Sequence, residues 1–178
     1  MKKNFRKVLS VVMILTMVFA MTATAFADTN ETPIVNFYIV EEDGTAILVD
    51  SVEAEVGQSV YDVVDSLSYY EPEWSTGTDV FDNALTTKYL TTYMGYGAVN
   101  VDHQYNSDGS GWSEDWGWLY TVGENHVMPT FPNEPNHGMA MNQYTIQNGD
   151  TIDVVYTLTK TAWDKDYNTT YDIVHLWY

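Results

Sequence analysis

Aromatic side chains crowd one short segment of this chain and alternate there with a period of two. Trp112, Trp116, Trp118 and Tyr120 fall within nine residues, inside the stretch GWSEDWGWLYTVG at 111–123. From residue 116 to residue 122 every second side chain is large and apolar, which is typical of a β-strand and not of a helix. A strand is therefore predicted at 116–122, and Trp112 is expected in the acidic loop before it.

The remaining chain shows more strand patterns and one helix pattern. Strand-like runs are found at 34–40, 46–56, 143–146, 151–158 and 171–178, whereas 85–96 fits either a strand pair or a loop. Ser59 is placed to cap a helix at 59–69, with Asp62 completing a capping box. Asn148-Gly149, between two strand-like runs, predicts a hairpin. We therefore expect a compact α+β domain, mainly β, with a mixed sheet and one main helix.

The N-terminus has the pattern of a secretory signal peptide, in a lysine-rich form that resembles bacterial signals. Four basic residues precede an apolar run at 8–20, and Ala25-Phe26-Ala27 provides small residues for cleavage. The apolar run is short for a membrane-spanning anchor, which is the alternative reading. We expect a signal peptide at 1–27, a polar linker at 28–33, and a secreted protein with no membrane association after cleavage.

Acidic residues dominate the chain and limit its partners. Four of the seven Lys and Arg residues lie in the predicted signal peptide, which leaves three lysines against 25 Asp and Glu residues. Such a chain cannot neutralise phosphates, so nucleic acid and anionic lipid surfaces are excluded as partners. The chain has no cysteine, which excludes disulfides and thiolate catalysis.

Motifs for catalysis and metal binding are weak or missing. The chain lacks a Gly-x-Ser-x-Gly elbow, a His-Glu-x-x-His pair and a phosphate-cradling glycine loop, so we expect no enzyme. Residues 104–115 match an EF-hand loop only in part, and a plain hairpin loop explains them better. His and Met residues at 126–128 and 137–141, with His103, have ligand types that suit copper, but methionines more often fill cores. We therefore predict no metal site.

Three motifs, taken together, resemble the transcobalamin C-terminal-like domain family. They are GQSVYDVV at 57–64, GWLYTVGE at 117–124, and the segment 139–156 with its Asn148-Gly149-Asp150 turn. In the second motif Gly123-Glu124 stands where the family has Asn-Gly. The resemblance covers 34–158 and leaves 159–178 as a C-terminal extension with an expected edge strand. Residues 70–115 form an insertion without a counterpart.

The resemblance implies a β-grasp-like domain and a ligand. In transcobalamin this domain closes like a lid over cobalamin held on a helical barrel domain. No barrel sequence accompanies the domain here, so a ligand bound from one side only is expected to bind more weakly.

The sequence therefore predicts a secreted, non-catalytic binding module for cobalamin, another corrinoid or a different ring-bearing small ligand, with no required cofactor. Candidate ligand-binding residues are Trp112, Trp116, Trp118, Tyr120, Trp74 and Tyr93. Trp112 and Trp116 are the strongest, because loops carry function on a rigid scaffold, whereas Trp118 and Tyr120 are better explained as core. The alternatives are a cell-surface glycan- or protein-binding adhesion module and a structural domain without a ligand.

Overall fold

The structure, a computed structural model, describes residues 31–79, 82, 84–166 and 169–178, and the predicted signal peptide at 1–27 lies outside them. These residues are mostly in strands and include one α-helix, so the predicted α+β, mainly β class is confirmed. No helix in this part of the chain is both long and apolar enough to span a membrane.

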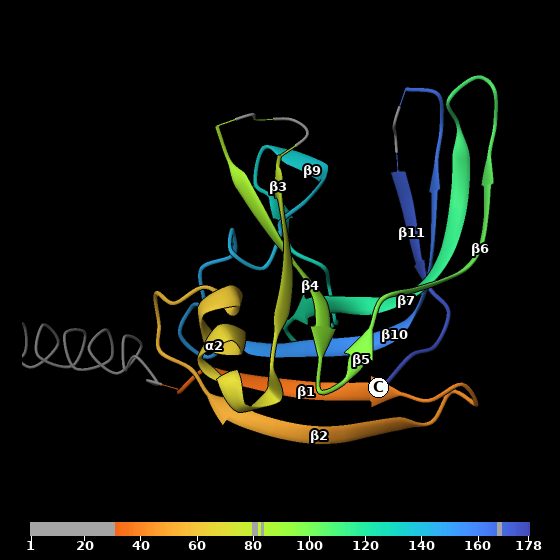
Figure 1. Cartoon of the computed structure of the whole chain (residues 1–178). Helices are drawn as coiled ribbons and strands as arrows, with labels where there is room; N and C mark the ends of the chain where they lie inside the picture. The colour runs from red at the N-terminus through yellow and green to blue at the C-terminus, as the bar shows by residue number, and fades with distance from the viewer. Residues whose placement is uncertain (1–30, 80–81, 83, 167–168) are drawn as a thin grey trace, which may run out of the picture. The chain divides into compact units, whose positions relative to one another are not determined.

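The elements form one large sheet and two small ones (Figure 1). In chain order they are β1 Ile34–Val40, β2 Ala46–Glu53, α2 Val60–Ser66, a 3-10 turn Ser68–Tyr70, β3 Glu73–Thr78, β4 Thr86–Tyr93, β5 Tyr96–Gly97, β6 Val99–Tyr105, β7 Gly111–Val122, β8 Thr130–Phe131, β9 Glu134–Gly138, β10 Thr151–Trp163 and β11 Thr169–Ile173. The large sheet has the order β2-β1-β10-β7-β6, with β11 also paired to β10. The small sheets are β3-β4-β5 and β8-β9.

Strand β10 holds the large sheet together because it has neighbours on both sides. Strand β7 lies antiparallel along one side, from Ile152↔Val122 to Trp163↔Gly111. On the other side β1 pairs in parallel with the first half of β10, and β11 pairs antiparallel with residues 159–163. Residues 152–159 are all buried, including the polar Asp153, Thr157 and Thr159, as expected for a central strand covered on both faces. The predicted extension therefore supplies the end of β10 and the edge strand β11.

The main core lies between α2 and one face of the large sheet. Val60 and Val64 of α2 meet Val35 and Phe37 of β1 and Ile152 of β10, and all five side chains are fully buried. Burying a side chain of this size contributes roughly 1.5–3 kcal/mol, so this cluster is a large share of the stability.

The predicted capping box forms, but the helix is shorter than predicted. Ser59 Oγ accepts a hydrogen bond from Asp62 N, and the Asp62 carboxylate accepts one from Ser59 N. The helix ends at Ser66 and not at residue 69, because Leu67 leaves the helical region with φ −84° and ψ 49°. The next two tyrosines, Tyr69 and Tyr70, both donate hydroxyl hydrogen bonds to Asp50 of β2, which favours the tight turn.

The hairpin predicted at Asn148-Gly149 is wrong. Residues 143–146 join no strand, and Ile146 instead exchanges backbone hydrogen bonds with Gly57 and Gln58 at the entry to the helix. Ile146 is fully buried there, which favours this docking over pairing with β10. The turn itself is held by Asp150, whose carboxylate accepts hydrogen bonds from Tyr144 Oη and Gln147 N.

The C-terminal tail covers the opposite face of the large sheet. Trp177 packs with Val40, Leu119 and Val155, and is 7% exposed. Its Nε1 donates to the buried carboxylate of Asp153 at 3.0 Å, and His126 Nδ1 lies 2.9 Å from the same oxygen. The tail is thus fixed by both apolar packing and a buried hydrogen-bond network.

The segment 70–115, which the sequence predicts to be an insertion, forms the β3-β4-β5 sheet, then β6 and the start of β7. The ends of β6, β7, β10 and β11 project beyond the rest of the sheet, and we call the residues 100–115, 159–166 and 169–173 the arm (Figure 1). Strand β7 begins at Gly111, so Trp112 lies in a strand and not in a loop as predicted. Residues 106–110 form the turn of the β6–β7 hairpin, closed by a hydrogen bond from Asn106 N to Ser110 O.

Candidate ligand site

Three of the predicted ligand-binding aromatics belong to the core. Tyr93 is 0% exposed and packs edge-on against Trp118, with ring centroids 5.4 Å apart. Trp118 is half-buried and its Nε1 donates to the backbone oxygen of Tyr96 at 2.9 Å. Tyr120 is 4% exposed and donates its hydroxyl to Met139 O at 2.9 Å. Burial raises the pKa of both the Tyr93 and the Tyr120 hydroxyl.

Two further predicted residues lie on separate surfaces. Trp74 of β3 packs edge-on against Tyr61 of α2 and donates its Nε1 to Asp65 at 3.1 Å. Trp112 lies on the arm, where the ammonium group of Lys160 sits 4.4 Å from its ring centroid. A cation over an indole ring is a favourable contact, but it covers the ring face that a ligand would use.

Trp116 is the predicted residue that adjoins a hollow. Its ring stacks on Tyr156 of β10, with centroids 5.7 Å apart and planes inclined by 22°. Tyr96 of β5 completes an aromatic group, because its ring centroid lies 5.2 Å from that of Tyr156. These rings border a hollow of about 240 Å³, which we call the Trp116 hollow; it is lined by Val40, Glu41, Glu42, Tyr96, Val99, Trp116 and Tyr156.

The hollow is rigid on its aromatic side and acidic at its rim. Tyr156 is almost fully buried and donates its hydroxyl to Gly97 O at 2.8 Å, which fixes the ring beneath Trp116. Burial, and then the neighbouring Tyr96, raise the pKa of the Tyr156 hydroxyl, so it stays neutral at physiological pH. Glu41 and Glu42 follow β1 and bring carboxylates to the rim, and no basic side chain is among the described lining residues. The site can therefore stack against an apolar ring and accept hydrogen bonds from polar groups at the ring edge.

Sequence reasoning did not single out most of this hollow. Tyr96, Val40 and Val99 come from three strands whose meeting depends on the parallel pairing of β1 with β10, 117 residues apart at the Asn36–Asp153 contact. Tyr156 was visible only as part of a strand-like run. Its alternation with Val154 and Leu158 placed it on the same face, but did not reveal Trp116 as its neighbour.

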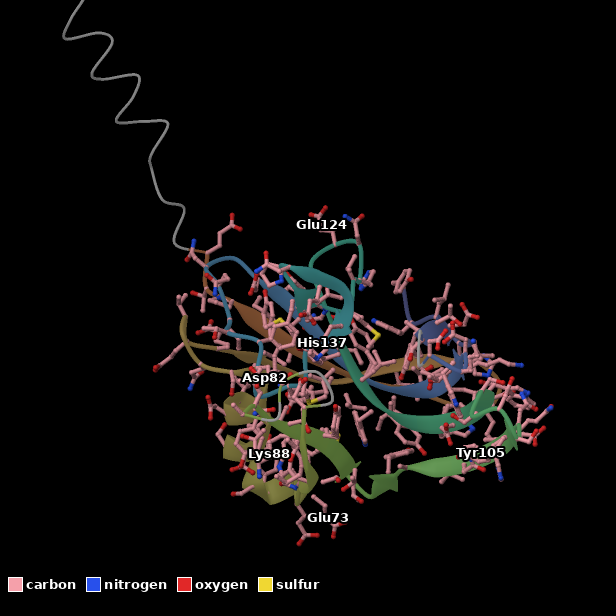
Figure 2. All side chains as sticks on the ribbon, turned by 90° about the horizontal axis from the view of Figure 1, so that it is seen from above. Glu73, Asp82, Lys88, Tyr105, Glu124 and His137 are labelled. Atoms are coloured by element: carbon pink, nitrogen blue, oxygen red, sulfur yellow. The ribbon has the colours of Figure 1, made fainter. Side chains whose placement is uncertain are left out.

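Of the three histidines whose ligand type suits copper, His126 and His137 contact carboxylates, and His103 contacts the side-chain oxygen of Asn100. His126 contacts Asp153, and His137, which is labelled in Figure 2, lies 2.9 Å from Asp79 and 3.1 Å from Glu134. Across the part of the chain that the structure describes, no three His, Asp or Glu side chains are grouped so that they could hold a metal ion. Met141 is buried in the main core, which fits the expectation that the methionines fill gaps.

Comparisons with protein-family models and with curated proteins do not identify a family for the chain. A scan against protein-family models finds no family that matches the chain, and a search of curated proteins finds no relative. The likeness to the transcobalamin C-terminal-like domain family therefore rests on the three sequence motifs alone.

Proposed function

We propose that this chain is a secreted, non-catalytic binding module that holds a ring-bearing small ligand in the Trp116 hollow. The observation that carries the proposal is the Trp116–Tyr156 stack, which places a partly buried indole over a fixed phenol ring at the edge of a hollow. Aromatic surfaces with a few polar groups around them are the usual make-up of small-ligand sites.

The size and charge of the hollow restrict the ligand. Its volume of about 240 Å³ is below that of pockets that enclose a whole drug-sized molecule, roughly 300–1,000 Å³. A ligand would therefore lay one face or edge against the rings and leave the rest in water. Glu41 and Glu42 favour a neutral or cationic molecule with hydrogen-bond donors at its rim. A corrinoid, with amide groups around a broad apolar ring, meets these conditions, and the family resemblance makes cobalamin the first ligand to test.

The test is a titration of the secreted chain with cyanocobalamin, followed by visible absorption and by equilibrium dialysis. We expect a saturable shift of the absorption band that Trp116→Ala abolishes. Trp112→Ala is the matched control, because it removes an indole from the same strand without touching the hollow. A shift that survives Trp116→Ala, or dialysis that shows no retention by the wild-type chain, contradicts corrinoid binding.

The second candidate is an adhesion module that binds a glycan or a protein at the cell surface. The arm favours it, because strands β6 and β11 leave large side chains in water there, including Tyr105, which is 70% exposed (Figure 2). Exposed aromatic groups on a projecting element are typical of recognition surfaces. Binding of the chain to intact cells or to polysaccharide, with no response to cobalamin, would favour this function.

A further inference from the structure

We propose that the arm carries a second binding site, for a neutral sugar ring, on the face that bears Trp163. The site is separate from the Trp116 hollow and does not depend on it, and it gives the glycan alternative a definite place. Strand register assigns the residues of this face. One row across the four strands is Tyr105↔Gly111↔Trp163↔Thr169, and the next is His103↔Ser113↔Thr161↔Tyr171.

The Trp163 ring is held in place before any ligand arrives. It lies over Gly111, where an added Cβ would come within 2.7 Å of Trp163 Cζ2 and would also clash with Gln104 O, so only glycine leaves room for the ring. Trp163 Nε1 donates to Gly109 O at 3.1 Å, and the Tyr105 ring lies beside it with centroids 5.6 Å apart. A ring fixed in this way loses little conformational entropy when a ligand stacks on it.

A hollow of about 420 Å³ adjoins this ring, lined by Tyr105, Gly109, Thr161, Trp163 and Thr169. Its volume falls within the range of small-ligand sites. The described lining side chains are aromatic or carry hydroxyl groups, and none is charged. A ligand that fits them has a flat apolar face for the indole and hydroxyl groups at its edge. A pyranose ring has both, since its C–H groups lie on one face and its hydroxyls point outward.

The charge of the chain restricts which sugars can bind at this site. The chain carries 25 acidic residues, so an anionic sugar such as a uronate would be repelled. Asp115 lies on the same face of the arm by alternation from Ser113, and its carboxylate already accepts a hydrogen bond from Asn100 at 2.6 Å. A carboxylate at this edge of the face accepts hydrogen bonds from sugar hydroxyls and gives none, which favours neutral oligosaccharides.

The experiment is a tryptophan-fluorescence and calorimetric titration of the secreted chain with cellotetraose, xylotetraose and chitotetraose. We expect saturable binding of at least one of them. Trp163→Ala should weaken it at least about tenfold, because a central tryptophan usually dominates such a contact. Thr161→Val, which keeps a β-branched side chain but loses the hydroxyl, should weaken binding by a smaller factor. Trp112→Ala is the matched control on the opposite face of the arm and should bind as the wild type does.

Several results would overturn the proposal. They are no saturable response to any of the three sugars up to about 10 mM, unchanged affinity in both Trp163→Ala and Thr161→Val, or loss of binding in Trp112→Ala. Circular dichroism of each variant shows whether the protein still folds. If Trp163→Ala does not fold, Thr161→Val alone tests the site. Trp116→Ala separates the two sites. It should leave sugar binding intact, and Trp163→Ala should leave any cobalamin response intact, so failure of one site is distinguishable from failure of the other.

Discussion

The buried tyrosines Tyr93 and Tyr120 have similar surroundings, but their hydroxyl groups contribute differently to the free energy of unfolding. Both lie in the main core, but the Tyr120 hydroxyl reaches Met139 O, whereas the Tyr93 hydroxyl meets no hydrogen-bond partner among the described residues. A buried polar group without a partner costs free energy that an apolar replacement does not.

Replacing each tyrosine by phenylalanine should therefore have different effects on the free energy of unfolding. We expect Tyr120→Phe to lower the free energy of unfolding by about 1 kcal/mol, because it removes a made hydrogen bond and leaves Met139 O unpaired. Tyr93→Phe should leave it unchanged or raise it by up to about 1 kcal/mol. Urea denaturation of the two variants tests this, and a larger loss in Tyr93→Phe than in Tyr120→Phe would contradict it.

At the residue scale, the sequence correctly predicts a strand in the aromatic segment, but it does not predict which groups each aromatic ring contacts. Period-two alternation predicted the strand and put Trp116, Trp118 and Tyr120 on one face. Their different contacts depend on what lies above each of them. Tyr93 and Tyr96, from the β3-β4-β5 sheet, cover Trp118, while Trp116 lies farther along β7 and borders a hollow. Contacts between two sheets leave no trace in the local sequence.

The start of helix α2 is the element boundary that the local sequence predicts best. The capping box uses residues three positions apart, so its signal is wholly local. The Ser59→Ala variant should lose about 1 kcal/mol of unfolding free energy, within the range of about 0.5–2 kcal/mol for such caps. Thermal and urea unfolding measure it, with Ser75→Ala at an exposed position of β3 as the control. Equal losses in both variants would show that the cap contributes nothing specific.

The hairpin at 143–158 failed as a prediction because Asn-Gly is a signal for a turn and does not specify that the segments before and after it pair with each other. Tyr144 and Gln147 close that turn onto Asp150, while β10 takes β1 and β7 as its partners. Strand β10 lies between β1 and β7 in the sheet, and helix α2 and the C-terminal tail bury its two faces.

The C-terminal tail is an element whose removal should be costly. Trp177→Ala would expose Val40, Leu119 and Val155 and break the hydrogen bond to Asp153, so we expect a loss of about 3–5 kcal/mol. The neighbouring Leu176 is 51% exposed, and Leu176→Ala should change stability by less than about 0.5 kcal/mol. Denaturant unfolding of the two variants gives the comparison. A small effect of Trp177→Ala would mean that the tail does not hold this face closed.

On the scale of the whole molecule, the buried tyrosines determine how the domain responds to alkaline pH. Burial raises the pKa of Tyr93, Tyr120 and Tyr144 above the ordinary value of 10.0, with Asp150 adding to the effect at Tyr144. The folded state keeps these protons where the unfolded chain releases them. Their contribution to stability is therefore fully present below about pH 10 and is lost as the pH rises through the folded-state values.

The free energy of unfolding should accordingly fall with pH above about 10. Urea unfolding at a series of pH values, with tyrosinate absorbance recorded in parallel, measures both the loss and the ionisation that causes it. Tyr120→Phe removes one of the groups and should make the decline shallower. A stability that stays constant to about pH 12 would contradict the assignment.

The parallel pairing of β1 with β10 also has a mechanical consequence. The chain enters β1 at Ile34, and β10 leaves toward the arm at its opposite end, with the two strands in register from Ile34↔Thr151 to Ile39↔Tyr156. Tension applied between Ile34 and Trp163 would pull the two strands in opposite directions along their length. Their hydrogen bonds would then be sheared together and not peeled apart one by one. A load delivered through the arm would meet its greatest resistance at the centre of the sheet.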